Sequence, residues 1–403
     1  MSKPKIRFNG YTEDWEQRKV SDLLQERNEQ APMDDEYPLM AFIANQGVAP
    51  KGERYDRSAL VNDEAGKKYK RTEYGDFIYS SNNLETGSIG LNKYGNACIS
   101  PVYSIFKPTG KADLDFLGRR FLRKDFINEM VKWRQGVVYG QWKIHESDFL
   151  KIQIAVPSID EQKAIGQYLD KLDTLITLHQ RKCEQTKKLK KYMLQKMFPQ
   201  NGSTVPEIRF AGFTEDWEQR KLGDIASRVQ GNDGRMELPT LTISAANGWM
   251  DQEDRFSGNI AGKEQNNYTL LHKGELSYNH GNSKLAKYGT VFALRTYEEA
   301  LVPRVYHSFK IDDGNADFIE YYFATKIPDR ELGKLITSGA RMDGLLNIGF
   351  DSFMGIELTV SGSEEQERIS DFFRELDILI TLHQRKCDEL QSIKKYMLQN
   401  MFT

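Results

Sequence analysis

The feature that most constrains this chain is a tandem duplication of its own sequence. Residues 4–23 return as residues 206–225 with 14 of 20 positions identical. Residues 169–198 return as residues 373–402 with 19 of 30 positions identical. Because only two copies occur, with a period of about 203 residues, the pattern excludes a solenoid of short repeats. A chain of 403 residues also exceeds the ~250–300 residues at which one hydrophobic core stops growing, so we expect two domains.

Between these matching ends the two copies diverge, although a weak similarity persists. Tyr103–Lys107, for example, resembles Tyr306–Lys310. Short apolar runs, glycine-bearing turns and a few helical stretches predict irregular α/β or α+β lobes, each closed by a short strand. The predicted domain boundaries are a first lobe at 1–158, a helix at 159–198, a linker at 199–205, a second lobe at 206–362 and a helix at 363–403.

The helix after each lobe carries a heptad pattern of apolar residues, which is typical of helices that pack lengthwise in a coiled coil. Each helix of roughly 38 residues is about 57 Å long at ~1.5 Å per residue. We expect the two helices to pair antiparallel and to give the chain pseudo-twofold symmetry, with homodimerisation through the same seams as the alternative. The predicted pairing residues are Leu169, Leu172, Ile176, His179 and Cys183, and then Phe373, Leu376, Ile380, His383 and Cys387.

Composition narrows the class of protein further. The three cysteines form no C-x-x-C pair, so the sequence supports neither a disulfide framework nor a zinc ribbon. We find no run of ~20 apolar residues and no secretory leader, which predicts a cytoplasmic location. The net charge of −2 excludes a uniformly basic protein. Arg181–Lys196 and Lys51–Arg71 are local basic clusters that fit either an electrostatic footprint for nucleic acid or a solvated surface.

Signatures of catalysis are missing from the sequence. It contains no G-x-x-x-x-G-K-[ST] phosphate loop, no G-x-G-x-x-G turn, no H-E-x-x-H and no Pro-Pro pair. His179 and His383 lie on the heptad seam, where packing or a hydrogen bond between helices is the expected role and metal binding is not. These absences are consistent with a protein that is not an enzyme and holds no metal, while an enzyme of another kind is the remaining alternative.

Two loops in each copy invite a functional interpretation. Trp133–Ile144 and its counterpart Thr337–Ile348 precede the closing strands, while Tyr79–Asn83 corresponds to Tyr278–Lys284. Glycines let a backbone approach a ligand closely, and arginine, glutamine and asparagine side chains can pair with the edges of bases. Ordinary surface hairpins are the alternative. The candidate DNA contacts are Ser80, Ser81, Asn82, Asn83, Arg134, Gln135, Tyr139, Gln141, Lys143, Asn279, His280, Asn282, Ser283, Lys284, Lys287, Arg341 and Asn347.

This arrangement resembles the specificity subunit of type I restriction-modification systems over essentially the whole chain. The resemblance is carried by the two I-R-F-x-G-[YF]-T-E-D-W-E-Q-R-K segments, the pairs Glu161-Gln162 and Glu365-Gln366, the repeated L-D-x-L-I-T-L-H-Q-R-K-C helices, and Ser283–Gly289. It implies that each lobe is a target-recognition domain for one half of an asymmetric, bipartite site in double-stranded DNA. It also implies that the helices are spacers that seat two methyltransferase subunits.

The same resemblance implies that this chain binds no cofactor. S-adenosylmethionine, ATP and Mg²⁺ then belong to the methyltransferase subunits and to the restriction and translocase subunits. Under this hypothesis, alanine at Arg134 or Arg341 weakens sequence preference more than overall affinity. The alternative function is a coiled-coil scaffold that binds peptide or RNA. The repeated Trp15 and Trp217 segments fit either core anchors or docking sites for partner subunits.

Overall fold

The chain forms two compact units, and each unit includes the end of the other copy's long helix. Unit 1 comprises Met1–His179 and Lys386–Thr403, and unit 2 comprises Gln180–Arg385. The computed structural model describes residues 3–50, 67–137, 141–200, 202–256, 262–281, 283–336 and 345–402.

Unit 1 is built around a four-stranded antiparallel sheet in the order β2-β10-β7-β8. Smaller sheets pair β1 with β13, β4 with β5, β11 with β12, and β3 with β6 and β9. The strands are β1 (Glu16–Lys19), β2 (Leu24–Glu26), β3 (Gln30–Ala31), β4 (Ala41–Ile43), β5 (Gly47–Ala49), β6 (Tyr69–Thr72), β7 (Phe77–Tyr79), β8 (Ile89–Leu91), β9 (Ala97–Ile99), β10 (Ser104–Pro108), β11 (Gln135–Val137), β12 (Gln141–Lys143) and β13 (Gln153–Val156).

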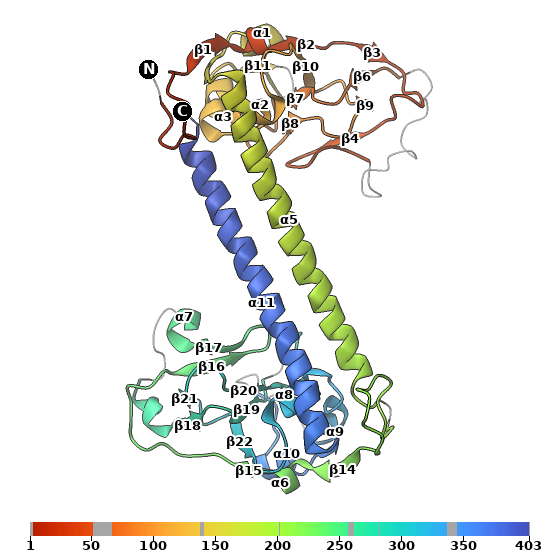
Figure 1. Cartoon of the computed structure of the whole chain (residues 1–403), viewed down its shortest axis with the longest axis vertical. Helices are drawn as coiled ribbons and strands as arrows, with labels where there is room; N and C mark the ends of the chain where they lie inside the picture. Colours follow the sequence, from red (N-terminus) through yellow and green to blue (C-terminus); the bar gives the residue numbers. More distant parts are fainter. Residues whose placement is uncertain are drawn as a thin grey trace. The chain divides into compact units, whose positions relative to one another are not determined.

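The helices of unit 1 complete its core (Figure 1). They are α1 (Val20–Leu23), α2 (Leu114–Phe121), α3 (Lys124–Val131), α4 (Glu146–Phe149) and the first part of α5 (Ile159–Lys196). Helix α2 begins where the Asp113 carboxylate accepts a hydrogen bond from the backbone N–H of Phe116 at 2.9 Å. It lies close against α5, because a Cβ atom at Gly166 would be 2.8 Å from that same carboxylate.

Unit 2 repeats this plan. Its four-stranded sheet has the order β15-β22-β19-β20, and smaller sheets pair β14 with β23, β16 with β17 and β18 with β21. The strands are β14 (Glu218–Lys221), β15 (Ala226–Arg228), β16 (Leu241–Ser244), β17 (Gly248–Asp251), β18 (Thr269–His272), β19 (Leu276–Asn279), β20 (Thr290–Ala293), β21 (Glu299–Val302), β22 (His307–Ile311) and β23 (Glu357–Val360). The helices are α6 (Leu222–Ile225), α7 (Gln252–Phe256), a 3₁₀ turn at Gly262–Asn267, α8 (Ala316–Ala324), α9 (Asp329–Lys334), α10 (Phe350–Met354) and α11 (Ser363–Asn400).

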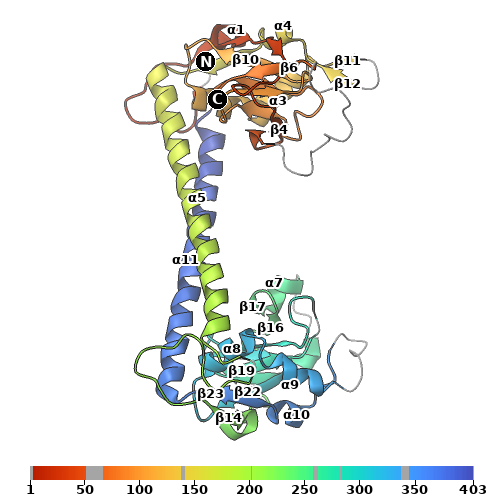
Figure 2. The same ribbon diagram turned by 90° about the vertical axis from the view of Figure 1, so that its right-hand side faces the viewer.

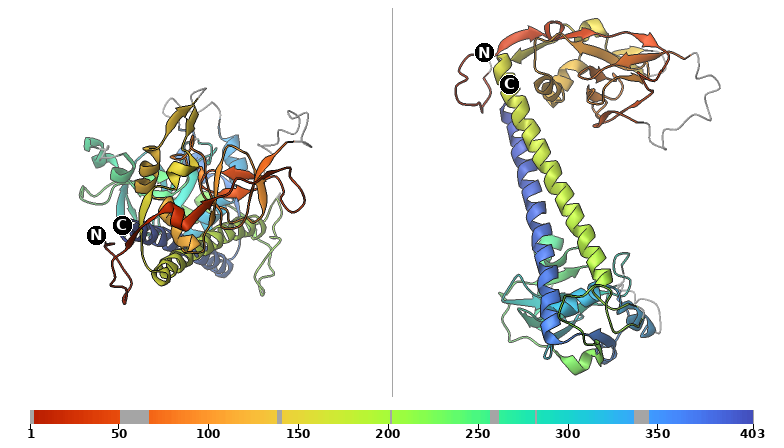
Figure 3. Two further views of the ribbon diagram at one scale, coloured as in Figure 1. Left: turned by 90° about the horizontal axis from the view of Figure 1, so that it is seen from above. Right: turned by 45° about the vertical axis from the view of Figure 1, so that its right-hand side comes forward.

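Helices α5 and α11 each contain 38 residues, the length that the heptad pattern predicts. In unit 1 the last turns of α11 lie beside the first turns of α5 (Figures 1 and 3), and Lys394 forms an ion pair with Asp173. In unit 2 Lys190 forms an ion pair with Asp377 at 2.5 Å. There the Cys183 thiol also lies 3.8 Å from the carbonyl of Ile380. Between these two contacts the residue number increases along α5 and decreases along α11, so the two helix segments run antiparallel within this unit.

Seven of the ten predicted pairing residues are buried. Leu169, Leu172 and Ile176 are buried in the core of unit 1, and Cys387 belongs to the same core. Phe373 and Leu376 are buried in the core of unit 2. Buried Cys183 lies in unit 2 as well, whereas His179, Ile380 and His383 are half-buried. No helix in the described part of the chain is long and apolar enough to cross a membrane.

The repeated I-R-F and Glu-Gln segments meet in each unit and join the lobe to the start of its helix. Glu161 is fully buried and accepts two hydrogen bonds from the Arg7 guanidinium, at 2.6 and 2.7 Å. Glu365 accepts the same pair from Arg209, at 2.7 and 2.8 Å, and a third bond from Trp217 Nε1 at 3.0 Å. The paired, charge-assisted geometry fixes the angle at which each helix leaves its lobe.

Both repeated tryptophans are core residues. Trp15 is 5% exposed and Trp217 is 2% exposed, and their rings lie edge-on or tilted against Phe116 and Phe318, respectively. The sequence left two roles open for these segments, core anchors or docking sites for partner subunits. The structure shows that the two indole rings are core anchors.

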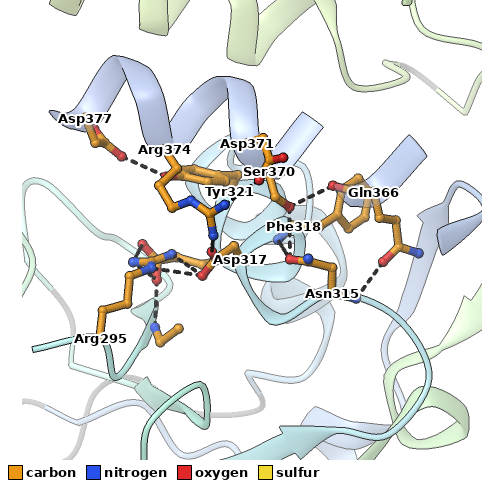
Figure 4. Close-up of polar contacts among 12 residues, drawn as sticks. Arg295, Asn315, Asp317, Phe318, Tyr321, Gln366, Ser370, Asp371, Arg374 and Asp377 are labelled. Carbon is orange, nitrogen blue, oxygen red and sulfur yellow. Dashed lines mark hydrogen bonds and ion pairs between the residues drawn. The ribbon is translucent and has the colours of Figure 1, made fainter. Parts of the chain in front are cut away.

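A polar network in unit 2 holds α8 against α11 (Figure 4). The Gln366 carboxamide accepts a hydrogen bond from the backbone of Asn315 at 2.9 Å. Two residues further along, Asp317 accepts from both Arg295 and Arg374, at 2.9 and 3.2 Å. Tyr321 donates to Asp377 at 2.9 Å. These bonds tie the lobe to the first turns of α11 along one face of α8, so lobe and helix form one body within the unit.

Candidate nucleic-acid interface

In unit 1 the two loops predicted to bind a ligand lie against each other. The Asn82 carboxamide oxygen accepts a hydrogen bond from the backbone N–H of Trp142 at 2.6 Å. One residue away, the Ser81 hydroxyl accepts from the backbone N–H of Ile144 at 3.0 Å. The loop after β7 therefore braces the β11–β12 hairpin, which lies at the side of the lobe away from α5 (Figure 2).

Arg134 is the second brace of this hairpin. Its two terminal nitrogens donate to the two Glu85 oxygens at 2.8 and 2.6 Å, and its side chain is 12% exposed. The hydrogen bond from Arg134 holds the pKa of Glu85 below its ordinary value. Because both terminal nitrogens are engaged by Glu85, the side chain proposed to read a base is turned instead toward its own lobe.

The remaining unit 1 candidates divide by exposure. Asn82, Asn83, Gln135 and Gln141 are exposed, and Lys143 is half-buried beside Glu146 at 2.6 Å. Ser80 and Ser81 are buried, at 5% and 6% exposure, so these two support the loop from beneath. Tyr139 lies outside the described residues.

In unit 2 the corresponding loops also meet. The backbone N–H of Leu346 donates to the carbonyl of His280 at 2.9 Å, and Gly281 forms a β-bridge with Leu345. The loop after β19 returns through Gly289, which has a φ of +83°. A Cβ atom at Gly289 would lie 2.5 Å from the carbonyl oxygen of Asn279, so only glycine fits this turn.

A buried histidine supports the second of these loops. His307 Nε2 lies 2.8 Å from the carbonyl oxygen of Ile348, which makes the neutral imidazole a donor to that carbonyl. Burial lowers the pKa of His307, with a smaller contribution from the charge of Arg228. His280 is 7% exposed and packs 4.8 Å from the His307 ring, so it lies beneath the loop.

The other unit 2 candidates are mostly on the surface. Ser283, Lys284, Lys287 and Asn347 are exposed. Asn279 is half-buried, and its amide donates to the carbonyl of Ile243 at 3.3 Å. Asn282 and Arg341 lie outside the described residues.

The structure describes all of the basic cluster Arg181–Lys196 but only the end of the cluster Lys51–Arg71. On α5, Lys190 is engaged by Asp377 and Lys196 by Glu207, while Lys187, Lys188 and Lys191 are exposed. This cluster is a largely solvated helix face. Of the cluster Lys51–Arg71, residues 51–66 lie outside the described residues.

Sequence reasoning missed three residues of these surfaces. Glu85 completes the Arg134 brace, Trp142 is 48% exposed on the hairpin, and Leu285 is 68% exposed in the loop after β19. The alternation of polar and apolar residues in Gln141-Trp142-Lys143 is the sequence signal that could have identified Trp142. Within the described ranges no cluster of three His, Cys, Asp or Glu side chains could hold a metal ion. The described residues of these loops offer hydrogen bonding, positive charge and the exposed ring of Trp142.

Known proteins resemble part or all of this chain. Residues 12–188 match the family model described as type I restriction modification DNA specificity domain. A curated relative, the type I restriction enzyme MjaVIII specificity subunit of Methanocaldococcus jannaschii, is 24% identical over 230 residues. That alignment covers 54% of this chain and 51% of the relative, so the chain spans about half the length of the curated relative that it matches.

Solved structures resemble the whole chain. The S subunit of a type I restriction-modification system from M. genitalium has a TM-score of 0.57 at 14% identity, covering 100% of this chain and 99% of its own. The HsdS subunit from Thermoanaerobacter tengcongensis has a TM-score of 0.45 at 15% identity, with 96% of each chain covered. The first likeness shows a shared fold, which confirms the predicted α/β lobes with two long helices.

Proposed function

We propose that the chain is a specificity subunit of a type I restriction-modification system and that it reads an asymmetric, bipartite DNA target. It catalyses no reaction itself. Unit 1 reads one half of the target and unit 2 reads the other.

One observation carries this proposal: the same framework presents two unlike surfaces. In both units the loop after the third strand of the four-stranded sheet meets the segment before the closing strand. The contents differ, because unit 1 exposes Gln135, Gln141 and Trp142, whereas unit 2 exposes Lys284 and Lys287. Equal scaffolds with different polar surfaces are what two different half-sites require.

Binding divides between two kinds of contact. Exposed lysines of the loops neutralise phosphates and make affinity dependent on salt. Glutamine and asparagine side chains contact base edges and supply the sequence preference. This division supports a protein that positions other subunits on a chosen DNA sequence.

The proposed partners are two methyltransferase subunits together with restriction and translocase subunits. Those subunits, and not this chain, hold S-adenosylmethionine, ATP and Mg²⁺. Because the ligand is the DNA of the cell, the cytoplasm stays the predicted location.

Genome-wide mapping of methylated bases tests the proposal. Cells that express this chain with its cognate methyltransferase subunit are compared with cells that express the subunit alone. We expect methylation of one split motif only when the chain is present, and the motif gives both half-sites. If the methyltransferase is active and binds this chain but no motif arises, the proposal is refuted.

A further inference from the structure

We propose that strands β11 and β12 form a two-stranded reading ribbon that enters the major groove, with Gln135 and Gln141 reading base pairs two steps apart. This inference rests on the proposed function and names the side chains that read the unit 1 half-site. The major groove of B-DNA is wide enough to admit a two-stranded β-ribbon.

The register of the ribbon fixes which side chains share a face. Gln135 is opposite Lys143, Gly136 opposite Trp142, and Val137 opposite Gln141. Side chains of opposed residues emerge on the same face, and successive residues alternate. One face therefore carries both glutamines with Lys143, while Trp142 lies on the other face over Gly136.

The glutamine face has the chemistry and the access that base reading needs. Gln135 and Gln141 are both exposed, and each carboxamide offers one acceptor and two donor hydrogens. A glutamine pairs in bidentate fashion with N6 and N7 of adenine. Lys143, half-buried beside Glu146, borders the same face and supplies positive charge.

The spacing of the two glutamines predicts how far apart their bases lie. Gln141 is the diagonal neighbour of Gln135 across the ribbon, two positions from Lys143. Diagonal neighbours of this kind are roughly 7–8 Å apart. Stacked base pairs rise ~3.4 Å each, so the two side chains span about two steps.

The ribbon is also held firmly enough to read. Three contacts fasten it to the lobe: the Arg134–Glu85 pair at 2.6 Å, the Asn82 bond to Trp142, and the Ser81 bond to Ile144. In unit 2 the loop after β19 contacts the segment before the closing strand at Leu346, and the sequence there differs. Changes on the ribbon should consequently alter one half-site and leave the other unchanged.

The test uses the full chain with its methyltransferase subunit and single substitutions Gln135→Ala and Gln141→Ala. Gln25→Ala is the matched control, because Gln25 is an exposed glutamine on β2 of the same unit. Methylated motifs are mapped in cells, and binding of the purified complex is measured on duplexes that carry every base pair at each half-site position.

We expect each ribbon variant to relax preference at one position, with the two positions separated by one base pair. Discrimination there should fall about 5- to 150-fold, the equivalent of ~1–3 kcal/mol for a bidentate base contact at ~1.4 kcal/mol per tenfold. The other half-site and the Gln25→Ala motif should stay as in the wild type.

Three results overturn the ribbon inference while leaving the proposed function intact. They are an unchanged motif in both variants, an equal loss of binding on every duplex, or relaxed positions that lie in different half-sites. A wild-type complex that is active and bound yet methylates no split motif overturns the proposed function, and the ribbon inference with it.

Discussion

Replacing Glu365 by alanine should destabilise unit 2 more than replacing Glu161 by alanine destabilises unit 1. The two glutamates are equivalent residues of the duplication, and both are buried, at 2% and 0% exposure. Each accepts two hydrogen bonds from an arginine, Arg209 or Arg7. The chain thus contains its own matched control for this substitution.

The expected losses of stability follow from the hydrogen-bonding groups that each alanine substitution leaves without a partner. Removing one partner of a buried ion pair costs ~3–5 kcal/mol. Because the arginine side chains are 14% and 15% exposed, we expect the lower end of that range for both variants. Glu365 also accepts from Trp217 Nε1, whereas Trp15 Nε1 has no hydrogen-bond partner in the described part of unit 1. A hydrogen bond to a charged group contributes ~1.5–3 kcal/mol, and this is the expected excess for Glu365→Ala.

Amide hydrogen exchange measured by mass spectrometry resolves the two units. Peptides that contain β1 and β14 report the opening free energy of units 1 and 2 separately. A third variant, Trp217→Phe, removes the indole donor and should be destabilising in the wild type but nearly neutral when Glu365 is alanine. Equal losses for Glu161→Ala and Glu365→Ala would refute the reasoning, as would a Trp217→Phe effect that is independent of Glu365.

Three further predictions concern single residues. Burial lowers the folded pKa of His307, while the unfolded value stays near 6.5. The contribution of neutral His307 to the stability of unit 2 should therefore be complete above that pH and should be lost as the pH falls below it. In urea unfolding, His307→Gln should flatten this pH dependence. Phe198→Ala should cost ~3–5 kcal/mol, because the ring is fully buried in unit 2; loss confined to unit 1 peptides in hydrogen exchange would contradict the assignment. Lys284→Ala should weaken binding equally on all DNA sequences and reduce the salt slope by about 1, a result that a change in the methylated motif would disprove.

The helices were predictable from sequence because their signal is local. Spacing of apolar residues along α5 and α11 indicated both their length and the seam that Leu169 and Phe373 occupy. The closing strands were likewise expected near Ile152–Val156, where β13 lies. In these cases one element's own residues decide its structure.

The details of the candidate site could not be predicted in the same way. Contact between Asn82 and Trp142 joins residues 60 positions apart, and it depends on where the sheet places two separate loops. Residue type alone also could not distinguish exposed Asn83 from buried Ser80, because serine and asparagine occur in both settings. The pairing of Arg134 with Glu85 depends on the same long-range arrangement.

The two copies share most of their sequence identity at their ends and little between them, and the composition of the two units explains why. Each unit takes the end of the other copy's helix, so Phe402 packs 5.3 Å from Phe116 in unit 1 and Phe198 packs 5.4 Å from Phe318 in unit 2. A helix end that changed alone would no longer fit the lobe of the other copy, which keeps the two ends alike. The described contacts of the β11–β12 hairpin are with its own lobe, so its sequence is free to diverge. Half-site preference can therefore change without disturbing the helix seam.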